Sequence, residues 1–210
     1  MSKKILVVTN TSKMDLDFDQ TVVLENERAK LTPLSMNHVD GLEEVASAHE
    51  DLLQYSPIRV YNREYLTNYI KNRLENRKSQ TWYSFAIFDK QEKKYAGSTS
   101  FLNISNHDQR LEIGATWYGK AFQRTGLNRH CKFLLLSYVF ETLEFERVEF
   151  RTDSRNSQSQ TAIQKIGGRL EGTLRSHTLM LDGFRRNTVC YSILKDEWVE
   201  LKKSVFKGFQ

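Results

Sequence analysis

The chain has 210 residues, 39% hydrophobic and 27% charged, which is enough for one ordinary core and marginal for two. Two prolines and ten glycines leave no room for a Pro- or Gly-rich linker. The 31 basic and 26 acidic residues give a net charge of +5, a mild excess that fits an anionic ligand or an acidic partner surface and does not demand nucleic acid. No run is apolar enough for a signal peptide or a membrane span, so we expect a cytoplasmic protein without membrane or nucleic-acid partners.

Taken in chain order, the pattern predicts a mixed α/β protein. Residues 1–20 are polar and uneven and are interpreted as an N-terminal extension, with a single domain over 21–210. Residues 22–33 predict a strand or hairpin. Apolar periodicity and start signals then predict a pair of helices over 35–77, with the second at 62–77. Three β-like runs (82–89, 94–104 and 110–117), a helix (127–143), a strand (147–153), a helix (156–166) and two final strands (169–175, 187–194) complete the predicted order.

A short polar loop opens directly into the long apolar helix. It is Gln123-Arg124-Thr125-Gly126-Leu127-Asn128. The first turn of a helix has unpaired N–H donors and the positive end of the dipole, so this loop favours an anionic ligand. A second helix start, at Ser157, follows the next strand. If the two strands are parallel neighbours, both helix starts face one cleft and can hold the two ends of one ligand.

Other chemical motifs fail on inspection. "GATWYGKA" matches G-x-x-x-x-G-K, but Ala121 stands where a phosphate-binding loop needs Ser or Thr for its metal. The five histidines have no ligand spacing, so no metal site is expected. Cys131 and Cys190 are far apart in apolar surroundings and are expected to be reduced.

Several motifs in the right order resemble the GNAT superfamily of acetyl-CoA-dependent N-acetyltransferases, in the branch of the RimJ/RimL ribosomal-protein N-terminal acetyltransferases. Gln123-x-x-Gly126 is similar to the family's Gln/Arg-x-x-Gly-x-Gly/Ala loop, although Asn128 replaces the last Gly or Ala. "EFRTDSRNSQSQ" and "LDGFRRNTVCYSILKDEW" resemble later segments of that branch, so the resemblance spans roughly 22–198. It implies a mixed sheet of six to seven strands with four helices, and splayed parallel strands that form the acetyl-CoA cleft.

The resemblance also implies roles for individual residues, and each residue has a structural alternative. The strand at Ala115, Thr116 and Trp117 would receive the pantetheine arm through its backbone, although Trp117 also reads as a core residue. The loop of Gln123, Arg124, Thr125, Gly126, Leu127 and Asn128 would bind the pyrophosphate, although Gly126 alone reads as a turn glycine.

The second helix start and the strand before the loop carry the implied catalytic roles. The resemblance implies that Asn156 contacts pantetheine; the structural alternative is that Asn156 only caps the helix. Ile163 occupies the place of the family's usual Tyr acid, which leaves Ser159 as the candidate proton donor, or as a plain first-turn residue. Glu112 is the candidate base, or an ordinary strand carboxylate, and Asp153 is an equally placed alternative.

We therefore expect direct acetyl transfer from acetyl-CoA to a primary amine, either a protein N-terminal α-amine or a small amine. Cys131 lies inside the predicted helix, which argues against an acyl-enzyme. The rival hypotheses are a non-catalytic acyl-CoA-binding or protein-interaction module on the same fold, and an RNA- or ribosome-surface binder suggested by the positive charge. The long final strands predict a homodimer.

Overall fold

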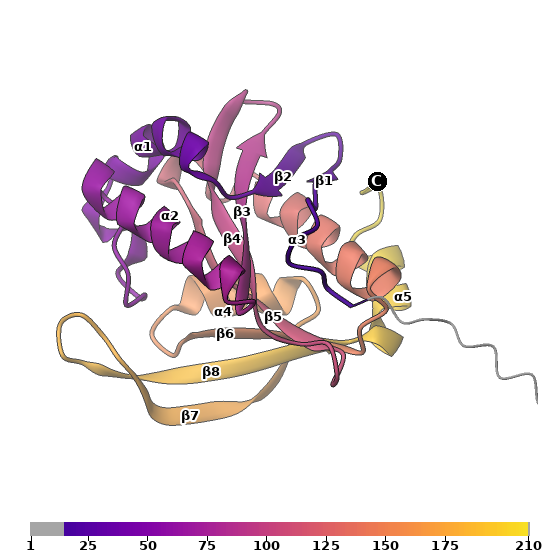
Figure 1. Cartoon of the computed structure of the whole chain (residues 1–210). Coiled ribbons are helices and arrows are strands. Elements are labelled where there is room, and N and C mark those ends of the chain that lie inside the picture. The colour runs from indigo at the N-terminus through magenta and orange to yellow at the C-terminus, as the bar shows by residue number, and fades with distance from the viewer. Residues whose placement is uncertain (1–14, 210) are drawn as a thin grey trace, which may run out of the picture.

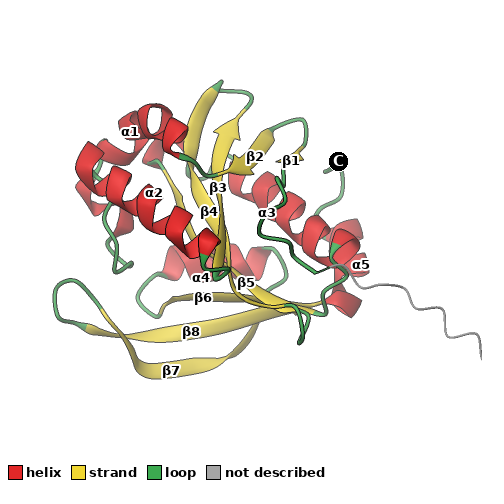
Figure 2. Cartoon of the chain, viewed as in Figure 1, coloured by secondary structure: helices red, strands yellow, loops and turns green. Residues whose placement is uncertain are grey.

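The computed structural model describes residues 15–209, which form one eight-stranded sheet and its covering helices (Figures 1 and 2). The strand order is β1-β2-β3-β4-β5-β6-β8-β7. Only β5 and β6 pair in parallel, and all other neighbours are antiparallel. The strands are β1 (Leu24–Glu25), β2 (Ala29–Pro33), β3 (Trp82–Asp89), β4 (Lys94–Ser105), β5 (Arg110–Tyr118), β6 (Arg147–Asp153), β7 (Arg169–Leu179) and β8 (Arg185–Leu194).

Five α-helices lie against the sheet. They are α1 (Val39–Ser47), α2 (Arg63–Lys78), α3 (Leu127–Ser137), α4 (Ser157–Lys165) and α5 (Lys195–Ser204). The α/β class, the mixed sheet and the single parallel pair beside the central helix confirm the predicted fold. The predicted counts of six to seven strands and four helices were each too low.

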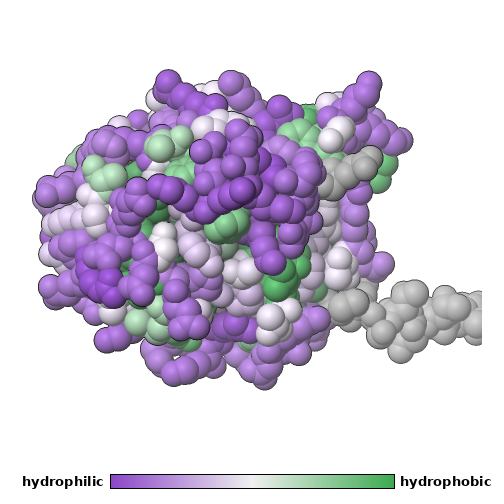
Figure 3. Space-filling model, turned by 90° about the horizontal axis from the view of Figure 1, so that it is seen from above, coloured by the Kyte–Doolittle hydropathy of each residue, from purple (hydrophilic) through white to green (hydrophobic). Residues whose placement is uncertain are grey.

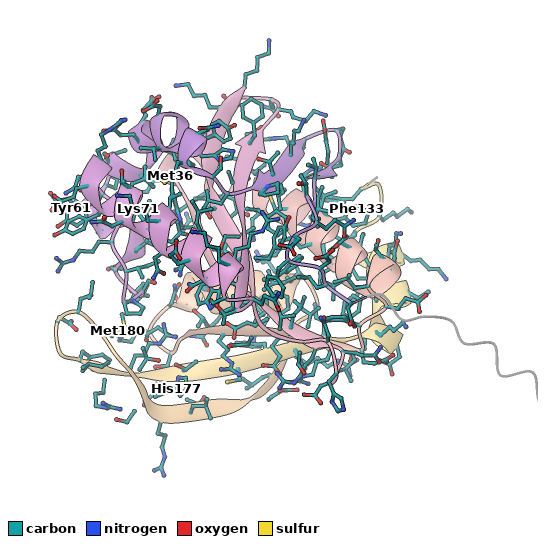
Figure 4. The ribbon with its side chains drawn as sticks, viewed as in Figure 1. Met36, Tyr61, Lys71, Phe133, His177 and Met180 are labelled. Carbon is teal, nitrogen blue, oxygen red and sulfur yellow. The ribbon has the colours of Figure 1, made fainter. Side chains whose placement is uncertain are left out.

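Helices cover both faces of the sheet, and each face has its own apolar core. On one face α1 and α2 pack over β3 and β4, around Leu42, Leu66 and Ile70. On the other face α3, α4 and α5 (Figure 1) contribute side chains to the larger core, such as Trp198 and Phe133, the second of which is labelled in Figure 4. The sheet is therefore the middle layer of three.

Part of the predicted N-terminal extension packs on this core. Residues 1–14 lie outside the described chain, but Leu16 and Phe18 are buried in the larger core. Arg77 Nε of α2 donates a hydrogen bond of 2.7 Å to the Phe18 carbonyl, which holds this segment against the helix. The described end of the extension is thus an integral part of the packed domain.

The apolar helix predicted over 127–143 is regular only in its first part. The α-helix ends at Ser137, and Tyr138–Thr142 continue as a single π-helical turn. The Leu143 N–H donates to the Tyr138 carbonyl at 3.0 Å, which gives the wider turn. The turn keeps Val139 and Phe140 in the core.

Candidate active site

The central feature of the site is the point where β5 and β6 separate. Their parallel ladder has three rungs and ends at Glu112 opposite Glu149. Beyond it, β5 has an irregularity against β4, and Ala115 adopts a left-handed φ of 47°. The bulge turns β5 away from β6, so the facing backbone groups beyond the last rung do not pair with each other. The predicted splay of the parallel strands is confirmed.

The loop before α3 has the shape of an anion-binding turn. Arg124 and Gly126 both have left-handed φ values, of 62° and 91°, and Gly126 is the N-cap of α3. A Cβ on Gly126 would meet no heavy atom within 4 Å, so the loop is open on that side. Arg124, Thr125 and Gly126 are exposed, whereas the Leu127 side chain is buried. Leu127 can therefore offer a ligand only its backbone.

Hydrogen bonds within this loop hold its shape. Thr125 Oγ1 donates to the Phe122 carbonyl at 2.9 Å, and Gln123 Nε2 donates to the Tyr118 carbonyl at 3.1 Å. Asn128 Oδ1 accepts from the Tyr118 hydroxyl at 3.2 Å. The Asn128 side chain, which replaces the small residue of the family motif, is thus directed at the end of β5.

The start of α4 lies beside the same loop. Asn156 is its N-cap, and its side-chain oxygen accepts from the Ser159 N–H at 2.9 Å. Gln158 Nε2 donates to Gln123 Oε1 at 3.2 Å, which joins the two helix starts. The Ser159 side chain is half-buried, and its hydroxyl has no hydrogen bond within residues 15–209. The structure therefore brings Ser159, Asn156 and the Gln123 loop to one edge of the sheet.

The side chains of Trp117 and Thr116 in β5 lie on opposite faces of the sheet. The Trp117 ring is 3% exposed and lies edge-on to Tyr69 of α2, at 6.4 Å between ring centroids. Its side chain belongs to the smaller core, and only its backbone can contribute to a ligand site. Thr116 points the other way: its Oγ1 lies 2.7 Å from Thr99 Oγ1 and accepts a hydrogen bond of 3.2 Å from Lys132 Nζ of α3.

Glu112 is 5% exposed and lies on the last rung before the splay. Asn103 Nδ2 donates to its Oε2 at 2.8 Å, and Arg151 Nε lies 3.4 Å from the same oxygen. Burial raises the pKa of Glu112, and the Arg151 charge and the Asn103 hydrogen bond offset only part of this. A carboxylate with a raised pKa at the mouth of the splay is suited to accept a proton.

Asp153, the alternative carboxylate, has a different environment. Burial acts to raise its pKa, but hydrogen bonds from the Arg155 side chain and N–H lower the pKa below its usual value. Arg155 Nη2 lies 2.7 Å from Asp153 Oδ2. Asp153 is therefore held as an anion and orients the turn before α4, and Glu112 is the better candidate base.

A pocket of ≈ 210 Å³ lies between two segments that are distant in sequence. One is the segment that leads into α2 and carries Tyr61, and the other is the tip of the β7–β8 hairpin, which carries Met180 (Figure 4). Arg186 Nη1 of β8 donates to the Tyr55 carbonyl at 3.1 Å and ties the hairpin to that segment. The sequence had indicated only a pair of helices over residues 35–77. The contribution of the hairpin tip, like those of Asn103 and Lys132, required the structure.

The described residues contain neither a candidate membrane span nor a candidate metal-binding cluster. No helix within 15–209 is long and apolar enough to cross a membrane. That same part of the chain holds no group of three or more His, Cys, Asp or Glu side chains placed to bind a metal ion. The surface seen from above in Figure 3 is largely hydrophilic, with small hydrophobic patches.

The splayed strands, with an open glycine-capped helix start beside them, define the class of the protein. Residues 28–169 match the family model described as Acetyltransferase (GNAT) domain, so the chain belongs to the GNAT acetyltransferase family, a family of transferase enzymes. The resemblance found in the sequence is thereby confirmed.

Individual relatives agree with this assignment. A curated Bacillus subtilis (strain 168) protein called "Putative ribosomal N-acetyltransferase YdaF" is 33% identical over 102 residues, which is 49% of this chain and 55% of that protein. The match thus spans about half of the curated relative's length.

Two solved structures are similar over most of their length. A GCN5-related N-acetyltransferase from Brucella melitensis is 26% identical with a TM-score of 0.84, covering 92% of this chain and 88% of that one. An acetyltransferase structure from T. thermophilus is 29% identical with a TM-score of 0.79, covering 88% of this chain and 95% of that one.

Proposed function

We propose that this protein is an acetyl-CoA-dependent N-acetyltransferase that moves the acetyl group directly to a primary amine. The observation that carries the proposal is the joined pair of helix starts beside the splay, with Gln158 bonded to Gln123. A pyrophosphate group fits the loop because Gly126 leaves its side open and helix N–H groups lie there. We propose that residues 21–210 form the acetyltransferase domain and that residues 1–20 are an extension before it. We also propose that the protein acts in the cytoplasm.

The donor side of the site binds and orients the thioester. In the proposal the loop of residues 123–128 holds the pyrophosphate with backbone N–H groups, and Arg124 adds positive charge. The unpaired edge of β5 at Ala115, Thr116 and Trp117 receives the pantetheine arm by hydrogen bonds that β6 does not use beyond Glu112. An N–H of this edge polarises the thioester carbonyl, and Asn156 contacts the arm from the start of α4.

Acetyl transfer itself requires one proton acceptor and one proton donor. The amine nitrogen attacks the carbonyl carbon, and its proton passes to Glu112 directly or through water. When the C–S bond breaks, its electron pair remains on sulfur, and the thiolate is protonated through the Ser159 hydroxyl, which relays a proton from water. No metal ion and no acyl-enzyme are part of this scheme.

The acceptor is proposed to be the N-terminal α-amine of a protein. The curated relative is named as a ribosomal N-acetyltransferase, which supports a protein acceptor. The pocket of ≈ 210 Å³ between the segment before α2 and the hairpin tip is proposed to receive that chain end. A small amine is the alternative acceptor.

Turnover tests the proposal directly. The full chain is incubated with acetyl-CoA and a panel of small amines and N-terminal peptides, and both free-thiol release and acetylated product are measured. We expect product with at least one α-amine peptide and none when its N-terminus is blocked. Tight acetyl-CoA binding without any acetylated product across the panel would favour the non-catalytic acyl-CoA-binding module.

A further inference from the structure

Lys132 is a buried lysine that the proposed mechanism does not use. It lies in the second turn of α3 and is 6% exposed. Its Nζ donates to Thr116 Oγ1 at 3.2 Å and lies 5.7 Å from the centroid of the Phe150 ring. An ammonium group has three N–H donors, and this one has a single hydroxyl as its hydrogen-bond partner among the residues that the structure describes.

This ammonium group also has no counter-ion. Within the described chain, no carboxylate lies at ion-pair distance from it. The titratable group that interacts with it is the Cys131 thiol, next to it on α3, and that thiol in turn interacts with the Tyr118 phenol on β5. Burial raises the pKa of Cys131 to about 12 and that of Tyr118 well above its usual value, so both are neutral at pH 7.

Burial also lowers the pKa of Lys132 to about 8, so the side chain remains mostly protonated at neutral pH. A buried charge without a partner carries a large desolvation penalty, and proteins usually avoid it by pairing. A lysine kept in this state would gain a large stabilisation from an anion that arrives beside it.

The position of Lys132 indicates which anion that is. Phe150 is the first residue of β6 beyond the last rung of the parallel ladder, and Thr116 lies on the part of β5 that has turned away. The ammonium group thus lies beside the opening between the two strands. In the proposed reaction the group placed in this opening is the thioester, and its sulfur becomes negative when the C–S bond breaks.

We propose that Lys132 is a further catalytic residue, whose ammonium group holds the thiolate of coenzyme A as it leaves. This inference rests on the proposed acetyl transfer. As the C–S bond breaks, the electron pair goes to sulfur, and the thiolate forms an ion pair with Nζ, which keeps its proton. The amine's proton goes to Glu112 or water, and Ser159 delivers a proton to the paired thiolate, which completes its departure. Lys132 therefore supplies the positive charge that stabilises the thiolate, and Ser159 supplies its proton.

The inference has a reciprocal consequence that can be measured without turnover. If the ammonium group stabilises the thiolate, it must lower the thiol pKa of bound coenzyme A by the same free energy. A lysine that only anchored Thr116 and the bulge of β5 would leave that pKa at its solution value. The ionisation of the bound thiol therefore distinguishes the two roles.

The experiment titrates the thiol of coenzyme A, free and bound to the full chain, by the ultraviolet absorbance of the thiolate. We expect the wild-type protein to lower the thiol pKa by at least ~1 unit, which is a ~10-fold preference for the thiolate. In Lys132→Met the bound thiol should titrate like the free one. Coenzyme A lacking its sulfur should bind both proteins equally, since the pyrophosphate loop is unchanged.

Each outcome bears on a separate claim. An unshifted thiol pKa in the wild-type complex overturns the role of Lys132, whatever the variant does, and so does an equal shift in both proteins. If Lys132→Met does not fold, Lys132→Arg, which keeps the charge, should retain the shift, and the wild-type titration still decides. Failure of the wild-type protein to bind coenzyme A or its sulfur-free analogue would instead overturn the proposed function, and this inference with it.

Discussion

Gln158 on the first turn of α4 donates a hydrogen bond of 3.2 Å to Gln123, which lies just before the left-handed turn that opens α3. The two side chains are 35 residues apart and follow different strands. Their contact places two positive helix ends at the same edge of the sheet, where the strands between them have parted. An extended ligand with an anionic middle and a reactive end fits this arrangement, and it sets the expectations below.

The donor loop is tested by Gly126→Glu. The carboxylate would block the N–H groups of the loop and repel the phosphates, so acetyl-CoA should no longer raise the melting temperature. The left-handed φ of 91° adds a strain on the order of 1 kcal/mol. Gly208→Glu is the matched control, because Gly208 has a φ of 88° and the same open space around it, but lies near the C-terminus. A thermal shift retained in Gly126→Glu would remove the pyrophosphate assignment.

The proton donor is tested by Ser159→Ala. The hydrogen bond to Asn156 uses the backbone N–H of Ser159, so the variant keeps the helix cap and should fold normally. We expect kcat to fall by about 100-fold, within the range that general acids contribute, with little change in acetyl-CoA affinity. Ser157→Ala, in the same helical turn, is the control. Near-normal kcat in Ser159→Ala would leave Ser159 as a first-turn residue only.

The base is tested by the pH profile of Glu112→Gln. Only the ionised carboxylate accepts a proton, so wild-type kcat/KM should rise with pH through the raised pKa of Glu112, above the ordinary value of about 4.3. The Gln variant should be slower and should lack this limb. A limb that persists in Glu112→Gln would assign the base to another group.

The same substitution should change stability in a defined direction. A raised folded-state pKa means that the native protein binds this proton more strongly than the unfolded chain does. Its contribution to stability is complete below the unfolded pKa and is lost as pH rises through the folded pKa. Relative to wild type, Glu112→Gln should therefore gain melting temperature as the pH is raised from the unfolded pKa through the folded one. A constant difference across that range would contradict the raised pKa.

The oligomeric state is tested at the edge strand β7. This strand is paired on one side only, and it exposes Leu170, Leu174 and Leu179. An unpaired edge with exposed leucines is a site where a second copy can add its own strand, so we expect a homodimer. Light scattering should show a dimer for the wild type and a monomer for Leu174→Lys. A wild-type monomer at every concentration would exclude this interface.

Much of the fold could be predicted because the apolar residues repeat with a clear helix or strand period and turn residues mark the ends of the elements. The strand predicted over 147–153 agrees with β6 at both ends, and the helix predicted over 62–77 is α2 within one residue. The short strand β1, Leu24–Glu25, has too few residues to show an alternating pattern. Helix α5 was missed because its Trp198 was interpreted only as the end of the segment "LDGFRRNTVCYSILKDEW". In the structure, the Leu194 N–H donates to Glu197 Oε2 at 2.9 Å at the start of this helix.

The candidate site was less accessible to sequence reasoning, because burial decided several roles. Lys132 stands among apolar residues of a helix, where a lysine ordinarily extends to solvent, and only the packing of α3 on the splayed strands buries its charge. Glu112 and Asp153 were equivalent in sequence. The structure separates them, because Arg155 holds Asp153 as an anion while burial raises the pKa of Glu112.

The bond between Arg186 and the Tyr55 carbonyl joins segments 131 residues apart, and neither segment contains a residue of the donor loop. On the proposed function, selectivity for the amine can therefore diverge independently of the loop that binds the acetyl donor. Grafting the hairpin tip and the segment before α2 from one relative into another, as a matched pair, should transfer acceptor preference. Grafting either segment alone should not transfer the preference, because the two segments line one pocket.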